Sequence, residues 1–103
     1  MQPIPTSPQE ALTILRDPNS EEWQRDYAMR MASVLEEATA DIVAIARNPD
    51  EPEALQQRAA ETLGFVWREQ DILTSADISG FAPAALQEIL FQRRQGEPFR
   101  GDQ

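Results

Sequence analysis

Apolar side chains recur along the chain at intervals of three and four residues, which is the periodicity of an amphipathic α-helix. The clearest stripe consists of Trp23, Tyr27, Met31, Val34 and Leu35. A second stripe, within residues 52–69, consists of Leu55, Ala59, Leu63, Val66 and Trp67. These stripes predict two long helices whose apolar faces, including Trp23 and Tyr27, are buried in the core.

Capping residues and prolines set the ends of the first three predicted helices. The segment Ser7-Pro8-Gln9-Glu10 is a capping box with proline at the first helical position, and it begins a short helix. Pro18 ends that helix, because a residue that precedes proline disfavours the helical conformation. We expect Ser20 to cap the second helix and Thr39 to cap the third.

The second half of the chain contains two more predicted helices. Asp50 and Glu53 form another capping box, which begins the helix over residues 52–69. Residues 70–82 show no helical periodicity and are expected to be irregular, and Pro83 opens the fifth helix. A length of 103 residues suits one domain. We therefore predict a single helical domain over residues 7–94, with flexible tails at 1–6 and 95–103.

Two stretches of the chain resemble each other at an offset of 31 residues. Residues 12–18 (LTILRDP) align with residues 43–49 (VAIARNP), and each is followed by a longer amphipathic helix. Residues 85–90, in the fifth helix, are interpreted as the start of a third, truncated unit. A period of this length with two helices per unit is typical of an α-solenoid.

The second unit contains the string Arg58-Ala59-Ala60-Glu61-Thr62-Leu63-Gly64, which resembles the second helix of a HEAT-type repeat. Across residues 8–93 the resemblance implies an all-α fold, with about five helices in a short HEAT-like superhelix. The alternative is an irregular five-helix bundle. A glycine inside a helix costs about 1 kcal/mol relative to alanine, so Gly64 predicts close packing against a neighbouring element.

Missing residue types exclude most enzyme classes. The chain has no cysteine and no histidine, and all nine of its cationic side chains are arginines. It therefore lacks thiolate and imidazole catalysts and the usual zinc ligands. Chemistry by carboxylates alone is the remaining possibility, but residues 71–75 lack the alternating oxygen ligands of a calcium loop. We expect no enzymatic activity, no cofactor and no metal site.

The formal net charge of −9 bears on the choice of partner. It disfavours nucleic acid and anionic membranes, whose phosphates repel an acidic surface, and it favours a basic protein. No apolar run approaches the ~20 residues that span a membrane, and no secretory signal is visible at the N-terminus. We expect a cytoplasmic protein, since cysteine is absent. The oligomeric state is left open.

Acidic residues gather in two regions of the sequence. The first is Glu36, Glu37 and Asp41, at the link between the second and third helices, and the second is Glu61, Glu69, Asp71 and Asp77. The functional interpretation is a negative surface that steers and holds a basic partner. The alternative is the ordinary solvated surface of an acidic helical protein.

Two large apolar side chains lie off the predicted core faces. Phe65 is about 200° from Leu63 around its helix, so it is either exposed as an interaction residue or packed beneath residues 72–73. Met29 lies beside Asp26 and Arg30 and is expected to be a partly exposed apolar spot in a polar ring. We expect all four groups, Asp26, Met29, Arg30 and Phe65, to contact the partner.

The remaining arginines have structural interpretations. Arg25, Arg30 and Arg58 lie at helical spacing from acidic residues and predict ion pairs within their own helices. Arg93 and Arg94 fall in the last turn of the fifth helix, where the helix dipole favours cations. Phosphate binding is their alternative role.

An acidic chain of about 100 residues with this build resembles bacterial immunity proteins and antitoxins. The resemblance implies a protein-interaction module that binds and neutralises a basic partner, such as a toxin. The helices near residues 21–36 and 52–68 are expected to line the binding side together. The alternative function is a general adaptor or an oligomeric scaffold subunit, which predicts an apolar contact patch.

Overall fold

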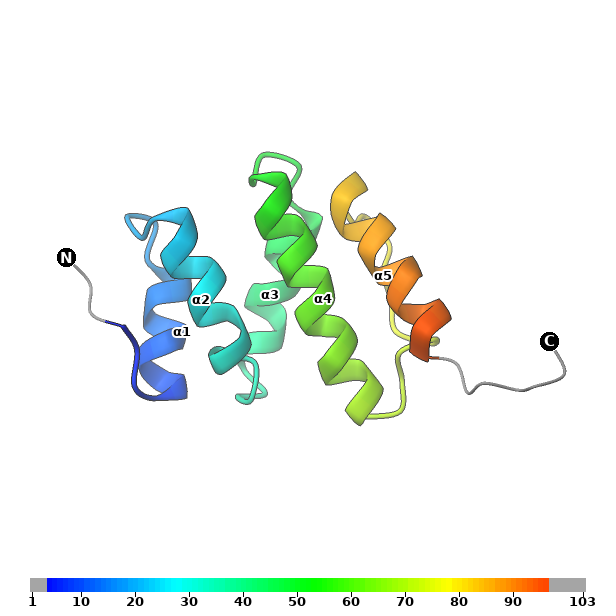
Figure 1. Cartoon of the computed structure of the whole chain (residues 1–103), viewed down its shortest axis with the longest axis horizontal. Coiled ribbons are helices and arrows are strands. Elements are labelled where there is room, and N and C mark those ends of the chain that lie inside the picture. Colours follow the sequence, from blue (N-terminus) through cyan, green and yellow to red (C-terminus); the bar gives the residue numbers. More distant parts are fainter. Residues whose placement is uncertain (1–3, 97–103) are drawn as a thin grey trace, which may run out of the picture.

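Five helices lie side by side in the computed structural model, which describes residues 4–96 (Figure 1). They are α1 (Pro8–Arg16), α2 (Glu22–Ala32), α3 (Ala38–Arg47), α4 (Glu53–Glu69) and α5 (Pro83–Gly96). Within residues 4–96 there is no strand, which confirms the predicted all-α class. The predicted tails fall in large part outside the described residues, at 1–3 and 97–103.

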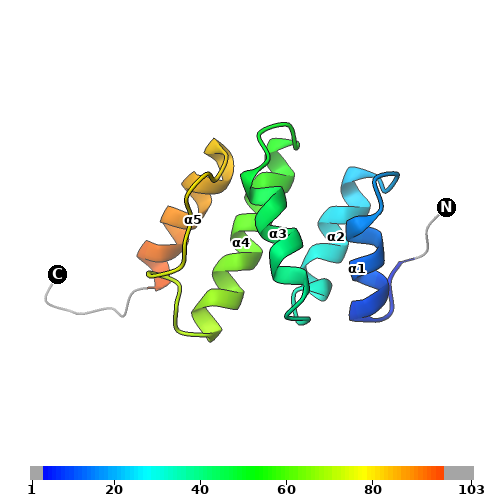
Figure 2. The same ribbon diagram turned by 180° about the vertical axis from the view of Figure 1, so that it is seen from behind.

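The helices form two layers. α2, α4 and α5 make the front layer in Figure 1 and run in the same direction, while α1 and α3 lie behind them and run the opposite way. The view from behind shows residues 70–82 (yellow) passing beside α3, in the rear layer (Figure 2). The backbone N–H of Ala82 donates a 2.8 Å hydrogen bond to the Ala46 carbonyl and ties this segment to α3.

The repeat in the sequence corresponds to a repeated turn. After α1, the Asp17 Oδ1 accepts a hydrogen bond from the Asn19 N–H at 2.9 Å. After α3, the Asn48 Oδ1 accepts from the Asp50 N–H at the same distance. Short Asp and Asn side chains bind backbone N–H groups two residues onward and stabilise such turns. Equivalent turns therefore connect the two helices within each hairpin, α1 to α2 in the first and α3 to α4 in the second.

Three predicted helix caps are wrong. Ser20 does not cap α2, because its hydroxyl donates instead to the Ile14 carbonyl at 2.8 Å in the core. Glu21 takes the cap position, and its N–H donates to Gln24 Oε1 at 2.7 Å. The other two corrections are one or two residues in size: α3 begins at Ala38, before Thr39, and Pro52 rather than Asp50 is the cap of α4.

The buried face of α2 is not the predicted one. Ala28, Met29 and Ala32 are fully buried, whereas Trp23 and Tyr27 are about half exposed, so the expectations of a buried Trp23 and an exposed Met29 are both wrong. The reason is that α2 packs against both α1 and α4. Alanines permit this close approach of two neighbours, and bulky aromatic rings at those positions would hold the helices apart.

The fifth helix lies in a different place from the one predicted. α5 packs on α4 in the front layer, which is the layer of the second helix of each unit, and not as the first helix of a third unit. Residues 70–82 occupy the rear layer instead. Two arginines hold this segment: Arg93 donates to the carbonyls of Leu73 and Ala76, and Arg47 donates to the carbonyl of Ser79. This anchoring uses the donors of Arg93 that phosphate binding would need.

α4 ends in a turn that strains one residue. Asp71 has a φ of 62°. Its N–H donates to the Arg68 carbonyl, and the Ile72 N–H donates to the Trp67 carbonyl at 2.9 Å. This pair of bonds defines a helix ending in which glycine is preferred at the left-handed position.

We expect Asp71→Gly to raise the free energy of unfolding by about 0.5–1 kcal/mol, because glycine adopts positive φ without steric cost. Thermal unfolding followed by circular dichroism would show the change as a higher Tm. Asp71→Ala is the control, and it should not stabilise, because alanine tolerates positive φ no better than aspartate does. A Tm for Asp71→Gly at or below the wild-type value would contradict this account of the turn.

Candidate functional site

The outer face of the front layer carries a groove between α2 and α4. Its volume is about 650 Å³, and it is lined by Glu21, Glu22, Trp23, Asp26, Ala54, Gln57, Arg58 and Glu61. Because α2 and α4 run in the same direction, successive turns of the two helices lie opposite each other along the groove (Figure 1). The prediction that these two helices share one surface therefore agrees with their placement.

The groove is acidic even after its internal ion pairs are counted. Arg58 donates from Nε to Asp26 Oδ1 at 2.9 Å and from Nη1 to Glu61 Oε1 at 2.7 Å. The hydrogen bond to Asp26 raises the pKa of Arg58, with a further contribution from Glu61. One guanidinium thus faces four carboxylates, those of Asp26 and Glu61 and those of Glu21 and Glu22. The groove suits a cationic group of a ligand or partner.

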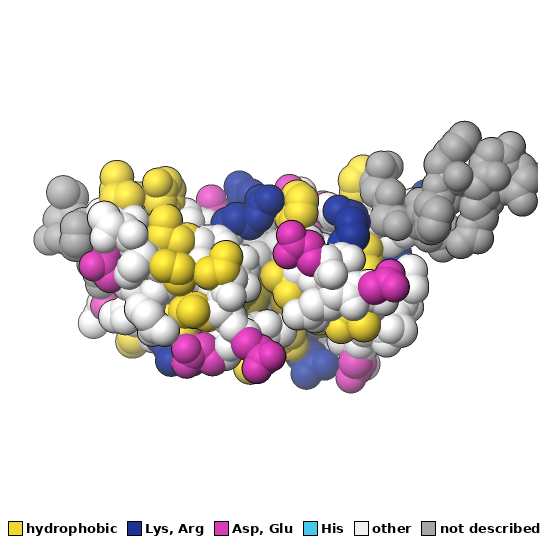
Figure 3. All heavy atoms as spheres, turned by 90° about the horizontal axis from the view of Figure 1, so that it is seen from below, with side chains coloured by type: hydrophobic (Ala, Val, Ile, Leu, Met, Phe, Trp, Pro, Cys, Tyr) yellow, Lys and Arg dark blue, Asp and Glu magenta, His cyan; other side chains and the backbone are white. Residues whose placement is uncertain are grey.

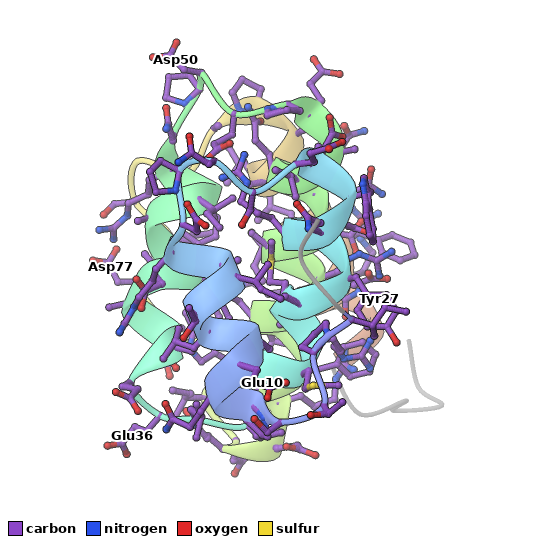
Figure 4. The ribbon with its side chains drawn as sticks, turned by 90° about the vertical axis from the view of Figure 1, so that its left-hand side faces the viewer. Glu10, Tyr27, Glu36, Asp50 and Asp77 are labelled. Carbon is purple, nitrogen blue, oxygen red and sulfur yellow. The ribbon has the colours of Figure 1, made fainter. Side chains whose placement is uncertain are left out.

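Aromatic side chains border the groove. Trp23 lines it and is 52% exposed, and Tyr27 follows one turn later on the same side of α2. Figure 4 shows Tyr27 pointing away from the helices on the side of the molecule opposite Asp77. Asp77, on the opposite side, is therefore not part of the face that carries the groove. Trp and Tyr side chains are enriched among the residues that dominate binding energy at protein interfaces, so Trp23 and Tyr27 are candidate contacts for a partner.

Phe65 lies on the same outer face, further along α4. It is 37% exposed, which selects the exposed interpretation over packing beneath residues 72–73. The guanidinium of Arg30 lies 3.8 Å from the centre of its ring, and that of Arg68 lies 5.8 Å away. Two arginines thus share one aromatic ring between α2 and α4.

The acidic residues predicted from the sequence do not form one cluster. Asp26 and Glu61 lie in the groove, whereas Glu36 and Glu37 lie at the lower end of the molecule, where Figure 4 labels Glu36. Asp41 accepts hydrogen bonds from Arg16 in the rear layer. Glu69 and Asp71 are exposed at the end of α4 and its following turn.

The end of the molecule seen from below has a mixed character. Figure 3 shows hydrophobic side chains gathered at the α1–α2 end, with arginines and acidic groups interspersed along both edges and acidic groups also on the face between them. The exposed apolar residues at this end include Ile4 and Val34. The surface is therefore not uniformly negative, although the net charge is −9.

Most of the ion pairs join two different elements of the fold, and few lie within a single helix. Arg25 pairs with Glu51 in the α3–α4 turn, and Arg58 pairs with Asp26 of α2. Only Arg58 and Glu61, among the three arginines in question, form a pair within one helix in the described part of the chain. The predicted intrahelical pairs of Arg25 and Arg30 are wrong, because Arg25 pairs with Glu51 of the α3–α4 turn and Arg30 stacks on the Phe65 ring, while Arg58 binds Asp26.

Sequence reasoning missed six of the residues that line the groove: Glu21, Glu22, Trp23, Ala54, Gln57 and Arg58. The apolar stripe predicts Trp23 in the core, and the helical spacing predicts Arg58 in an ion pair within its own helix. The available signal was the run of alanines at positions 28 and 32, which marks the close-packed face of α2 and places Trp23 on the other side.

A second groove flanks α4 on its other side. It measures about 560 Å³ and is lined by Glu53, Ala54, Gln57, Ala84, Gln87, Glu88 and Phe91. Ala54 and Gln57 belong to both grooves, so the first half of α4 is a low ridge between them. Ala54 is the small side chain on this ridge.

Comparison of the chain with protein-family models, curated proteins and solved structures gives no match. Within residues 4–96, no helix has the length and apolar character required to cross a bilayer. The same residues contain no group of three or more side chains arranged to hold a metal ion. The features that the site does present are a groove rich in carboxylates, exposed aromatic rings and a pair of arginines on Phe65.

Proposed function

We propose that this protein binds and neutralises a basic protein partner, in the manner of an immunity protein or antitoxin. The observation that carries the proposal is the groove between α2 and α4, in which four carboxylates and one arginine lie beside the exposed ring of Trp23. A cationic side chain of a partner would find both carboxylate acceptors and an aromatic face there. Binding at such a surface requires no catalytic group.

The long-range field supports the same partner class. A net charge of −9 attracts a basic protein and raises its association rate, and this contribution weakens as salt screens the charges. The aromatic residues supply the short-range part, because Trp and Tyr bury large areas when a partner covers them. Charge steers the encounter, and the aromatic anchors slow dissociation.

The fold supports a binding role as well. Two hairpins with equivalent turns, arranged in two layers, present α2, α4 and α5 as one broad surface (Figure 1). HEAT-type repeats stack helix pairs in this general manner, and stacked helix pairs provide extended binding surfaces. We propose that the chain is a short member of that structural type.

The test is binding of the purified chain to basic products of neighbouring genes, measured by isothermal titration calorimetry at low and high salt. We expect salt-sensitive binding, and we expect Trp23→Ala to weaken it by about 30-fold, or 2 kcal/mol, the size of an interface hot spot. If the partner is a toxin, the chain should also suppress its activity at equimolar concentration.

Leu90→Ala is the matched control, because Leu90 is also an exposed apolar residue on a front-layer helix, at 43%, and lies outside both grooves. It should leave the affinity unchanged. Absence of salt-sensitive binding to every neighbouring product would reject the proposal. A loss of affinity with Leu90→Ala and none with Trp23→Ala would place the contact on α5 instead.

One observation favours the adaptor or scaffold alternative. Leu86 and Leu90 are exposed on α5 outside both grooves, and no further helix packs beyond α5 in the described part of the chain. An apolar end of this kind suits self-association. Light scattering at micromolar concentration distinguishes the two functions: a dimer that Leu90→Glu dissociates would support the scaffold, and a monomer would favour the inhibitor.

A further inference from the structure

Arg30 and Phe65 form a preorganised contact on the outer face. The guanidinium of Arg30, on α2, lies 3.8 Å from the centre of the Phe65 ring on α4. Stacking on an aromatic face restricts the guanidinium plane and leaves its N–H edge directed sideways, where a carboxylate can accept two hydrogen bonds. Arg30 is exposed, so a partner can reach that edge.

Five other arginines in the described part of the chain already have polar partners. Arg16, Arg25, Arg47 and Arg58 each form an ion pair with a carboxylate, and Arg93 donates to two backbone carbonyls. Arg30 and Arg68 form no ion pair with any described residue. An acidic protein that leaves two arginines on one ring without a carboxylate has a site complementary to an external anion.

The absence of an internal partner for Arg30 has a structural cause. Asp26 lies four residues earlier on α2, at a spacing that would allow an intrahelical pair with Arg30. Arg58 takes that carboxylate instead, at 2.9 Å from its Nε. Arg68 is also committed, since its Nη2 donates to Gln92 Oε1 at 2.8 Å and holds the second guanidinium near Phe65.

We infer that the Arg30–Phe65 pair binds a carboxylate of the protein partner, one helical turn from the point where the acidic groove binds a cation. This inference rests on the proposed function, since the partner's cation defines the neighbouring contact. Asp26 precedes Arg30 by four residues on α2, and Glu61 precedes Phe65 by four on α4. The carboxylates of Asp26 and Glu61 therefore begin about 6 Å before the Arg30–Phe65 pair along each helix axis.

This spacing specifies the partner's chemistry. A partner helix with Lys or Arg at one position and Glu or Asp four positions away presents both charges on one face at the same interval. A polyanion does not fit, because the net charge of −9 repels a row of phosphates, whereas a single carboxylate beside a cation carries no net charge to the surface. The paired charges fix the direction in which the partner helix lies.

The first experiment tests the carboxylate site without a basic partner. Sodium acetate would be exchanged for sodium chloride at constant ionic strength, and the arginine Nε–Hε signals followed by NMR. We expect the Arg30 signal to saturate at an acetate concentration about five-fold lower than the Arg16 signal. Arg16 is the matched control, because it is an exposed arginine whose N–H groups are already bound to Asp41. Equal responses of the two signals would overturn the inference.

The second experiment uses two synthetic helical peptides of about 20 residues. They are rich in lysine and identical except that one carries Glu, and the other Gln, four positions from a central Lys. We expect the Glu peptide to bind the wild-type chain about five- to ten-fold more tightly in calorimetry. The preference should disappear with Arg30→Gln and with Phe65→Leu, and it should persist with Arg16→Gln, which removes the same charge elsewhere.

The outcomes separate the two ideas. Equal affinities of both peptides for the wild-type chain would overturn the inference and leave the proposed function standing. Failure of both peptides to bind at low salt would count against the basic partner, while the acetate titration would still decide the carboxylate site. Circular dichroism of Arg30→Gln should match the wild type, because Arg30 is exposed, so a lost preference reports recognition and not unfolding.

Discussion

Replacing Arg25 with alanine should lower the free energy of unfolding by about 3 kcal/mol. Arg25 donates from Nη1 and Nη2 to the two carboxylate oxygens of Glu51, at 2.9 and 2.7 Å. The two side chains are only 20% and 15% exposed, and the pair connects α2 to the α3–α4 turn. The hydrogen bond to Glu51 raises the pKa of Arg25, so the guanidinium stays charged. Removing the Arg25 guanidinium would leave the largely buried Glu51 carboxylate without its partner.

Urea unfolding followed by far-ultraviolet circular dichroism measures this loss. Arg16→Ala is the matched control, because Arg16 also binds a carboxylate with two nitrogens, but its pair with Asp41 is 49% and 29% exposed. Exposed pairs contribute about 0–1 kcal/mol. If Arg25→Ala cost no more than Arg16→Ala, the pair would not connect the two hairpins energetically. The double variant Arg25→Leu/Glu51→Leu should recover most of the loss, since it leaves no unpaired charge.

Gly64→Leu should lower the free energy of unfolding by about 2–3 kcal/mol, the usual cost of overpacking a filled interior. A Cβ placed at Gly64 would lie 3.0 Å from Cγ of Gln92 on α5. Gln92 cannot move away freely, because it accepts from Arg68 at 2.8 Å and donates to Glu88 at 2.9 Å. A leucine would push α5 away from α4 and break the bond between Arg68 and Gln92, which connects the two helices.

Chemical denaturation with hydrogen exchange of α5 tests this prediction. Gly64→Ala should change stability little, because the gain of about 1 kcal/mol in helix propensity is offset by the crowding. Ala44→Leu, at an exposed position of α3, is the control for adding the same side chain to a helix. Equal stabilities of Gly64→Leu and Ala44→Leu would show that Gly64 is not needed for contact with α5.

The helices could be predicted from the sequence because their signals are local. Periodic apolar residues, prolines and capping residues act within a few positions of each other, so the five segments and the all-α class followed directly. The repeated Arg-Asx-Pro string also predicted the equivalent turns at Asp17 and Asn48. The helix starts were less exact, since Ser20 used its hydroxyl to bind the core carbonyl of Ile14.

The orientation of α2 could not be obtained in this way. Hydrophobicity favoured Trp23 and Tyr27 for the core, but α2 has two neighbours and needs small residues toward both of them. Met29 and the alanines fill that space, and the aromatic rings remain outside. The exposed Trp23 ring lines the candidate site. The wrong prediction of a buried Trp23 and its omission from the predicted site residues therefore have the same cause.

The sequence by itself determined the number and approximate extent of the helices, the repeat, the net charge of −9 and the lack of thiol and imidazole catalysts. Only the tertiary structure decided which side chains each arginine contacts. Arg25 and Glu51, Arg58 and Asp26, and Arg30 and Phe65 are between 26 and 35 residues apart in the chain. Packing of α2 beside α4 brings them together, because contacts between distant segments depend on how whole faces fit and not on local spacing.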